Sequence, residues 1–293
     1  MLVHRIRYAT AVTAAAAATA VLLPLGLASA TAATATTSAT TSATTSATAT
    51  RHAAKPTIVL VHGAWADGSS WSGEVSRLQR DGYTVAVAPN PLRGLSSDAA
   101  YLRDYLAGIS GPIVLVGHSY GGAVITNAAT GNANVKALVY IDAYLPDADQ
   151  TVADLSGEDS ALAPAPTNPT SVFKLVNYPG APAGVYDTYV LPDVFVRGFA
   201  GDLSSATGAQ LAASQPPTSL IALGEHSGTP AWKTIPSWDL IGTKDKIIPE
   251  AQQVAMAEHA GARTQKFNAS HLGIISQPGT VTSFIEKAAC AKG

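Results

Sequence analysis

The sequence has 293 residues, of which 47% are hydrophobic and 13% are charged, with 18 Lys and Arg against 20 Asp and Glu. This charged share is about half the usual one, which excludes a solvated disordered chain, a coiled coil and a nucleic-acid binder with a basic face. The single cysteine, Cys290, excludes an intramolecular disulfide framework and a zinc site of several cysteines. The length allows one large domain or two small ones.

The N-terminal segment has the pattern of an export signal. Arg5 and Arg7 precede an uncharged apolar run, and Ala28-Ser29-Ala30 fits a cleavage site of small residues. Residues 1–30 are therefore predicted to be a secretory signal peptide, which would make the protein secreted; an uncleaved membrane anchor is the alternative. Ala, Thr and Ser make up almost all of residues 31–50, which predicts a flexible linker over 31–55.

From residue 56 onward, apolar strands alternate with helical stretches. Apolar runs at 57–61, 83–87, 112–116 and 136–141 are typical of strands buried on both faces. Further strands are expected at 237–242 and, shorter, at 264–267. Helices are expected at 71–80, 98–109, 120–129, 249–260 and 281–289. This alternation predicts an α/β fold over 56–293, with a mostly parallel sheet flanked by helices and a ligand site beyond the carboxyl ends of its strands.

Residues 147–232 interrupt this alternation. They are rich in Pro, Gly, Ser and Ala and contain no long apolar strand. Because a structureless loop of this length is improbable in a compact domain, we predict a small inserted cap. Its apolar residues are expected to form the roof of a pocket: Val172, Phe173, Leu175, Tyr178, Tyr186, Tyr189 and Phe195.

The segment Gly117-His118-Ser119-Tyr120-Gly121-Gly122 follows one of the buried strands and opens a helix. In that context the pattern G-x-S-x-G predicts a sharp turn that lifts the serine hydroxyl above the sheet, with glycines where side chains would clash. Ser119 is therefore the candidate nucleophile.

A serine hydroxyl needs a base, and the base needs an acid to hold its tautomer. His271 lies in the loop after the last strand and is the candidate base, with His226 in the cap as the fallback. Asp245 follows the preceding strand and completes the chain order nucleophile, acid, base. Asp142, at the end of another strand, is the alternative acid.

An oxyanion that forms during acyl transfer needs two preorganised donors. The backbone N–H of Tyr120, just after Ser119, is one candidate, and the N–H of Ala64, in the turn after the first strand, is the other. The side chain of Trp65 is a candidate for lining the substrate pocket.

These motifs resemble the α/β-hydrolase superfamily, and in particular its cofactor-free branch of plant methylesterases, hydroxynitrile lyases and bacterial esterases. The resemblance rests on VLVHGAW, GHSYGG, LVYIDAYLPD, DKIIPE and NASHLG. It implies a triad of Ser119, Asp245 and His271. Hydroxynitrile lyases of this type carry Thr where this chain has Gly63 and Lys where it has Leu272, which argues against lyase activity, whereas Asp142 replaces a common Ala of methylesterases.

The sequence thus predicts a secreted serine hydrolase that cleaves small, moderately hydrophobic carboxylic esters through an acyl-enzyme. A lactonase, amidase or perhydrolase with the same triad is an alternative, as is a non-catalytic protein that binds small molecules. No phosphate loop, dinucleotide fingerprint or clustered metal ligands occur in the sequence, so no cofactor or metal is expected. The expected partner is a small ester, with no nucleic acid and no stable membrane association after cleavage.

Overall fold

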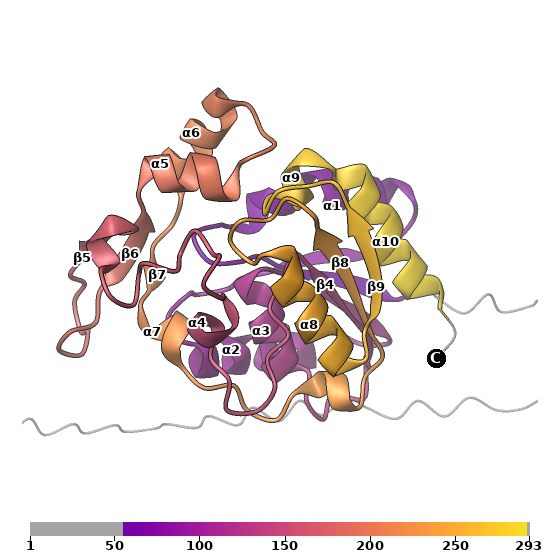
Figure 1. Cartoon of the computed structure of the whole chain (residues 1–293). Coiled ribbons are helices and arrows are strands. Elements are labelled where there is room, and N and C mark those ends of the chain that lie inside the picture. The colour runs from indigo at the N-terminus through magenta and orange to yellow at the C-terminus, as the bar shows by residue number, and fades with distance from the viewer. Residues whose placement is uncertain (1–54, 292–293) are drawn as a thin grey trace, which may run out of the picture. The chain divides into compact units, whose positions relative to one another are not determined.

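The computed structural model describes residues 55–291 (Figure 1). The predicted signal peptide over 1–30 and residues 31–54 of the predicted linker lie outside this range. Within the described range, no helix combines the length and the apolar character needed to cross a membrane.

Six parallel strands form the central sheet, in the order β2-β1-β3-β4-β8-β9. Their bounds are β1 (Thr57–Val61), β2 (Val85–Ala88), β3 (Ile113–His118), β4 (Val135–Ile141), β8 (Ser237–Gly242) and β9 (Arg263–Phe267). The prediction of an α/β fold around a parallel sheet is confirmed.

Helices cover both faces of this sheet, which explains why a central strand such as β1 is apolar on both sides. In β1, Ile58 and Leu60 pack into one core and Val59 and Val61 into the other. The core that contains Val59 also receives side chains from α2 (Leu95–Ala107), α3 (Tyr120–Ala128) and α8 (Glu250–Ala260). The opposite core receives side chains from η1 (Gly68–Trp71), α1 (Ser72–Arg80), α9 (Gly273–Ser276) and α10 (Pro278–Cys290).

Helix α2 begins at Leu95, three residues before its predicted start. Its N-terminus is capped from outside the local sequence, because the carboxylate of Glu225 accepts a hydrogen bond of 2.8 Å from the N–H of Ser96. A partner 129 residues away leaves no local signal. The helix ends at Ala107, before Gly108.

Residues 147–232 contain a second, antiparallel sheet of three short strands in the order β5-β6-β7, which Figure 1 shows to one side of the six-stranded sheet. The elements of this segment are α4 (Val152–Leu155), η2 (Pro169–Ser171), β5 (Phe173–Val176), β6 (Asp187–Val190), α5 (Pro192–Val194), η3 (Phe195–Phe199), α6 (Ser205–Ser214), β7 (Thr218–Ser219) and α7 (Ile221–Gly224), with η4 (Ala231–Lys233) at its end. We call residues 147–232 the cap.

Candidate active site

Ser119 lies at the sharp turn between β3 and α3. Its φ of 53° is in the left-handed region, which a non-glycine residue adopts only when the surroundings hold it there. The surroundings are tight, because a Cβ on Gly121 would lie 2.5 Å from the carbonyl oxygen of Val61 and one on Gly117 would lie 2.6 Å from the carbonyl oxygen of Gly121. The two glycines therefore let the backbone pack closely enough to hold Ser119 in this conformation.

The structure brings Ser119, His271 and Asp245 into one hydrogen-bonded chain. His271 Nε2 lies 2.9 Å from Ser119 Oγ, and His271 Nδ1 lies 2.8 Å from Asp245 Oδ2. The side chains of His271 and Asp245 are both buried. With Nδ1–H donated to the carboxylate, Nε2 is free to accept the serine proton, which is the arrangement that makes a serine hydroxyl nucleophilic.

Both carboxylate oxygens of Asp245 accept hydrogen bonds. Its Oδ1 accepts from the N–H groups of Ile247 (2.7 Å) and Ile248 (3.0 Å). Its Oδ2 accepts from Gln253 Nε2 (3.0 Å) as well as from His271. These donors fix the orientation of the carboxylate and leave no rotational freedom to the group that faces the imidazole.

Asp142, the alternative acid, is fully buried but makes no hydrogen bond to His271 in the described part of the chain. Its Oδ1 accepts from the N–H of Gly242 at 2.7 Å, and its Oδ2 has no partner among the described residues. Burial raises the pKa of Asp142 well above its ordinary value, and the neighbouring charge of Asp245 raises it further. The geometry therefore brings Asp245, and not Asp142, to the imidazole.

Two backbone N–H groups are available beside Ser119. The N–H of Tyr120 opens α3, and the N–H of Ala64 lies in the turn after β1. Within residues 55–291, neither donates a hydrogen bond. Since buried N–H groups in folded proteins are almost always paired, two free ones at the rim of a cavity are ready to bind an oxygen anion.

His118 supports His271 from behind. His118 Nε2 lies 2.8 Å from the carbonyl oxygen of His271 and donates to it, and the two rings are 4.9 Å apart. Burial, with the nearby His271 as a second cause, lowers the pKa of His118 to about 3, so the ring stays neutral at ordinary pH. No role is predicted for His118 from the sequence, in which its place directly before Ser119 is the available signal.

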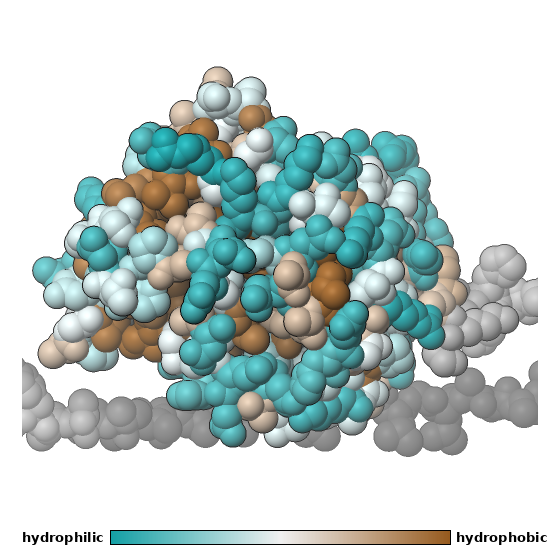
Figure 2. All heavy atoms as spheres, viewed as in Figure 1, coloured by the Kyte–Doolittle hydropathy of each residue, from teal (hydrophilic) through white to brown (hydrophobic). Residues whose placement is uncertain are grey.

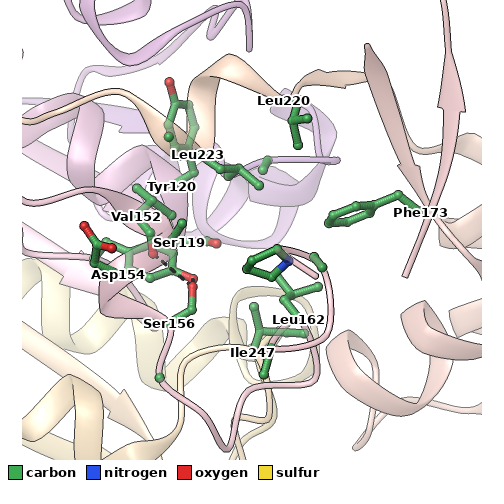
Figure 3. Close-up of a pocket in the computed structure, with 18 of the residues that line it drawn as sticks. Ser119, Tyr120, Val152, Asp154, Ser156, Leu162, Phe173, Leu220, Leu223 and Ile247 are labelled. Atoms are coloured by element: carbon green, nitrogen blue, oxygen red, sulfur yellow. Dashed lines mark hydrogen bonds between the residues drawn. The ribbon is translucent and has the colours of Figure 1, made fainter. Parts of the chain in front are cut away.

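A cavity of about 710 Å³ opens in front of Ser119. Ala64, Trp65 and Tyr120 line it together with residues of the cap. Figure 3 shows Ser119 on one side of this cavity and Phe173 of β5 on the other, with Leu162 and Ile247 between them. Of the apolar cap residues expected to form its roof, only Phe173 lines the cavity.

The remaining lining comes mainly from two parts of the cap and is mostly apolar. These residues are Val152, Ala153, Asp154, Ser156, Gly157, Glu158, Ala163, Ala165, Pro166, Pro169, Leu220, Leu223 and Gly224, with Tyr144 from the core. Figure 2 shows apolar side chains gathered on this face below α5 and beside β5 and β6. No Lys, Arg or His belongs to the described residues that line the cavity, whereas Asp154 and Glu158 lie exposed at its edge.

A second, much smaller cavity of about 40 Å³ lies on the His271 side. His118, His271 and Leu272 line it together with Phe195 and Phe199 of the cap. Ala64 and Trp65 line both cavities. At ~15 Å³ for each water molecule, the smaller cavity has room for two or three waters.

His226, the fallback base, is exposed and is absent from the described lining of both cavities. Its Nδ1 lies 2.7 Å from the carbonyl oxygen of Asp149. No group of three or more potential metal-ligating side chains occurs between residues 55 and 291. The acid, base and hydroxyl that form a hydrogen-bonded chain among the residues described above are those of Asp245, His271 and Ser119.

Comparisons with known proteins identify the family of this chain. The model of the "Alpha/beta hydrolase family" matches residues 58–283. The "Carbendazim hydrolyzing esterase" of Nocardioides sp. (strain SG-4G) is 34% identical over 102 residues, which are 30% of this chain and 42% of the esterase. The "Alpha/beta hydrolase nvfD" of Aspergillus novofumigatus (strain IBT 16806) is 27% identical over 256 residues, which are 80% of this chain and 97% of that protein.

Among solved structures, the pyrethroid hydrolase from Sphingobium faniae JZ-2 superposes with a TM-score of 0.64. The superposition covers 80% of this chain and 98% of the other at 22% identity, and so shows a shared fold. With a parallel sheet, a serine at the turn after β3 and a family match over most of its length, the chain belongs to the alpha/beta hydrolase family.

Proposed function

We propose that the protein is a serine hydrolase that cleaves small, moderately hydrophobic carboxylic esters through an acyl-enzyme. The observation that carries this proposal is the continuous hydrogen-bonded chain from Ser119 through His271 to Asp245. The esterase name of the 34% identical relative supports the same reaction class. Asp245 is then the acid of the triad, and Asp142 is not.

The reaction follows from the positions of these groups. Ser119 Oγ attacks the ester carbonyl carbon while His271 Nε2 takes the hydroxyl proton, and the carbonyl oxygen gains a negative charge. The N–H groups of Ala64 and Tyr120 bind this oxyanion. As the tetrahedral intermediate collapses, the bond to the alcohol oxygen breaks and His271 returns its proton to the leaving alcohol. Water then attacks the acyl-enzyme by the same route and releases the acid.

The cavities indicate where the larger part of the ester lies. The leaving oxygen must lie beside His271, which lines the smaller cavity, whereas Ser119 and Tyr120 line the larger one and Ala64 lines both. We therefore place the larger apolar portion of the ester in the cavity of about 710 Å³. The described lining of this cavity contains no cation and includes the carboxylates of Asp154 and Glu158, which favours an uncharged ester over an anionic one.

Kinetics of Ser119→Ala test the proposal. With p-nitrophenyl butyrate as substrate, kcat is expected to fall by at least about 10⁴-fold, and labelling by a fluorophosphonate probe is expected to disappear. Ser237→Ala, which changes a buried serine of β8, is the matched control and should retain activity and labelling. Unchanged hydrolysis and labelling in Ser119→Ala would contradict the proposal.

We also propose that the protein is exported with cleavage after Ala30. The support is the order of Arg5 and Arg7, an apolar run and Ala28-Ser29-Ala30 in the sequence. N-terminal sequencing of the protein in the culture medium should start at Thr31. An intact N-terminus in the membrane fraction, with none in the medium, would favour an anchor.

A further inference from the structure

We propose that the cap holds the oxyanion turn in its working position, and that Thr188 and Thr218 of the cap are positioning residues that act through Trp65. This inference rests on the hydrolysis proposed above, because it assigns the N–H of Ala64 to the oxyanion. It gives the cap sheet a part in the chemical step in addition to covering the substrate.

Trp65 has a backbone conformation that its own sequence does not favour. It directly follows Ala64, and its φ of 53° lies in the left-handed region, where a bulky residue is a rare outlier. Such a conformation is strained and persists only where the surroundings hold it. The orientation of the Ala64 N–H therefore depends on whatever holds Trp65.

Two threonines of the cap supply the hydrogen bonds that hold it. The backbone N–H of Trp65 donates to Thr218 Oγ1 at 2.9 Å. Its indole Nε1–H donates to both the carbonyl oxygen and Oγ1 of Thr188, at 3.1 Å each. Thr188 Oγ1 in turn donates to the carbonyl oxygen of Thr218 at 2.7 Å. The two threonines are fully buried, so water cannot replace either bond.

Aromatic packing extends the same support to the base. The Trp65 ring stacks on Phe173 with a centroid separation of 5.2 Å and meets the edge of Phe199 at 5.7 Å. Phe199 also packs edge-on against His271 at 5.2 Å. One set of cap residues therefore touches both the oxyanion turn and the catalytic imidazole.

The cap sheet is itself anchored to the core, so it can act as a fixed support. The N–H of Ser219 in β7 donates to the carbonyl oxygen of Leu92 at 2.9 Å. The guanidinium of Arg93 binds the carboxylate of Asp187 in β6 at 2.8 Å. Strands β6 and β7 are thus bound to the core through Asp187 and Ser219, the residues next to Thr188 and Thr218.

Neither threonine touches the substrate space. Trp65 lines both cavities, whereas Thr188 and Thr218 are absent from the described lining of each. A loss of their hydroxyl groups should therefore disturb the transition state more than the bound substrate. This separates positioning from binding, because binding effects raise KM whereas a displaced oxyanion donor lowers kcat.

The test compares Thr218→Val and Thr188→Val with Thr282→Val. Thr282 is also buried, and its hydroxyl donates to the carbonyl oxygen of Pro278 in α10, on the opposite core. The assays measure kcat and KM for p-nitrophenyl butyrate and the inhibition constant of a butyl trifluoromethyl ketone, whose serine adduct places an oxyanion between the same donors.

For Thr218→Val we expect kcat to fall by about tenfold or more, with KM changed by less than about threefold, since removal of an oxyanion donor outright costs about 10²-fold to 10³-fold. The inhibition constant of the ketone should rise by the same factor as kcat/KM falls. Thr188→Val should show a smaller change of the same kind, because the carbonyl oxygen of Thr188 still accepts from the indole. Thr218→Ser should restore activity, and Thr282→Val should match the wild type.

The outcomes separate the two proposals. Equal kcat in Thr218→Val and Thr282→Val, with Ser119-dependent turnover intact, would overturn the positioning role alone. A change confined to KM would also overturn it and leave the cap as a substrate cover. Turnover that does not depend on Ser119 would instead contradict the proposed function. If Thr218→Val does not fold, Thr188→Val decides the same question.

Discussion

Replacement of Asp245 by Asn should abolish most activity while leaving the site almost unchanged in shape. In the native protein, Asp245 Oδ1 accepts from two backbone N–H groups, at 2.7 Å and 3.0 Å. An asparagine must present its amide oxygen to these two donors, because an NH₂ group there would leave both of them unpaired. The NH₂ group must then occupy the position of Oδ2 and face His271.

That orientation gives His271 the wrong tautomer. With an NH₂ donor opposite Nδ1, the imidazole can keep this hydrogen bond only if Nδ1 is the acceptor and the proton is on Nε2. Rotation of Gln253 does not relieve the conflict, because its Nε2 also donates to the carbonyl oxygen of Ile248 at 2.8 Å. A protonated Nε2 cannot accept the hydroxyl proton of Ser119, which it faces at 2.9 Å.

The expected loss in kcat for Asp245→Asn is about 10⁴-fold, the size seen when a serine triad is locked in the wrong tautomer, which corresponds to about 5.4 kcal/mol in the activation free energy. KM should change little, because the carboxylate does not line either cavity. Steady-state hydrolysis of p-nitrophenyl butyrate at neutral pH measures both constants.

Asp142→Asn is the matched comparison. Burial and the charge of Asp245 raise the pKa of Asp142 well above its ordinary value, which favours the neutral form of its carboxyl, and an amide resembles that form. The amide oxygen can still accept from the N–H of Gly242. We expect kcat within about tenfold of the wild type, since one neutral hydrogen bond is worth about 1 kcal/mol. Near-normal activity in Asp245→Asn together with a loss of about 10⁴-fold in Asp142→Asn would refute this reasoning and assign the acid to Asp142.

Other predictions concern stability and the surroundings of the triad. Burial raises the pKa of Glu74 from 4.5 to about 8, so the unfolded chain loses this proton at lower pH than the folded one and stability falls as pH rises from 4.5 to 8. Glu74→Gln should remove this loss. Relative to the wild type, its free energy of unfolding should rise by up to about 5 kcal/mol between pH 4 and pH 8.5, as measured by urea unfolding. An equal difference at the two pH values would contradict this. Gly121→Ala would press a methyl group to within 2.5 Å of a backbone oxygen at the end of β1, and it should abolish activity, whereas Gly108→Ala, where a Cβ lies 3.5 Å from its nearest neighbour, should not. His118→Phe removes the donor to the carbonyl oxygen of His271 and should lower kcat by about tenfold with an unchanged fold by circular dichroism; full activity would exclude a supporting role.

Local patterns in the sequence were enough to predict the sheet and the turn at Ser119. Strand β3 is apolar from Ile113 to Val116 because both of its faces are buried, and Gly117 and Gly121 mark a turn with no room for side chains at these positions. The parallel order then determines that loops after several strands meet at one edge, which is why Asp245 and His271 could be named as partners of Ser119 before their distances were known.

Features that depend on distant parts of the chain could not be predicted in this way. Glu225 caps α2 from 129 residues away, and Thr188 and Thr218 contact Trp65 across 123 and 153 residues. The cavity lining was also mispredicted for most of the apolar cap residues, because only Phe173 of those expected lines the main cavity. Short strands and irregular segments lack the periodicity from which the inward-facing residues could be identified.

The central claim is that Ser119 forms a covalent bond to the acyl portion of the substrate. Mixing the protein with p-nitrophenyl butyrate, stopping the reaction with acid during the first turnovers and analysing the peptides by mass spectrometry measures this bond directly. A butyryl group on the peptide that contains Ser119, absent from the same peptide of Ser119→Ala, is the predicted result. Ester hydrolysis with no adduct on Ser119, or with the butyryl group on another residue, would contradict the mechanism.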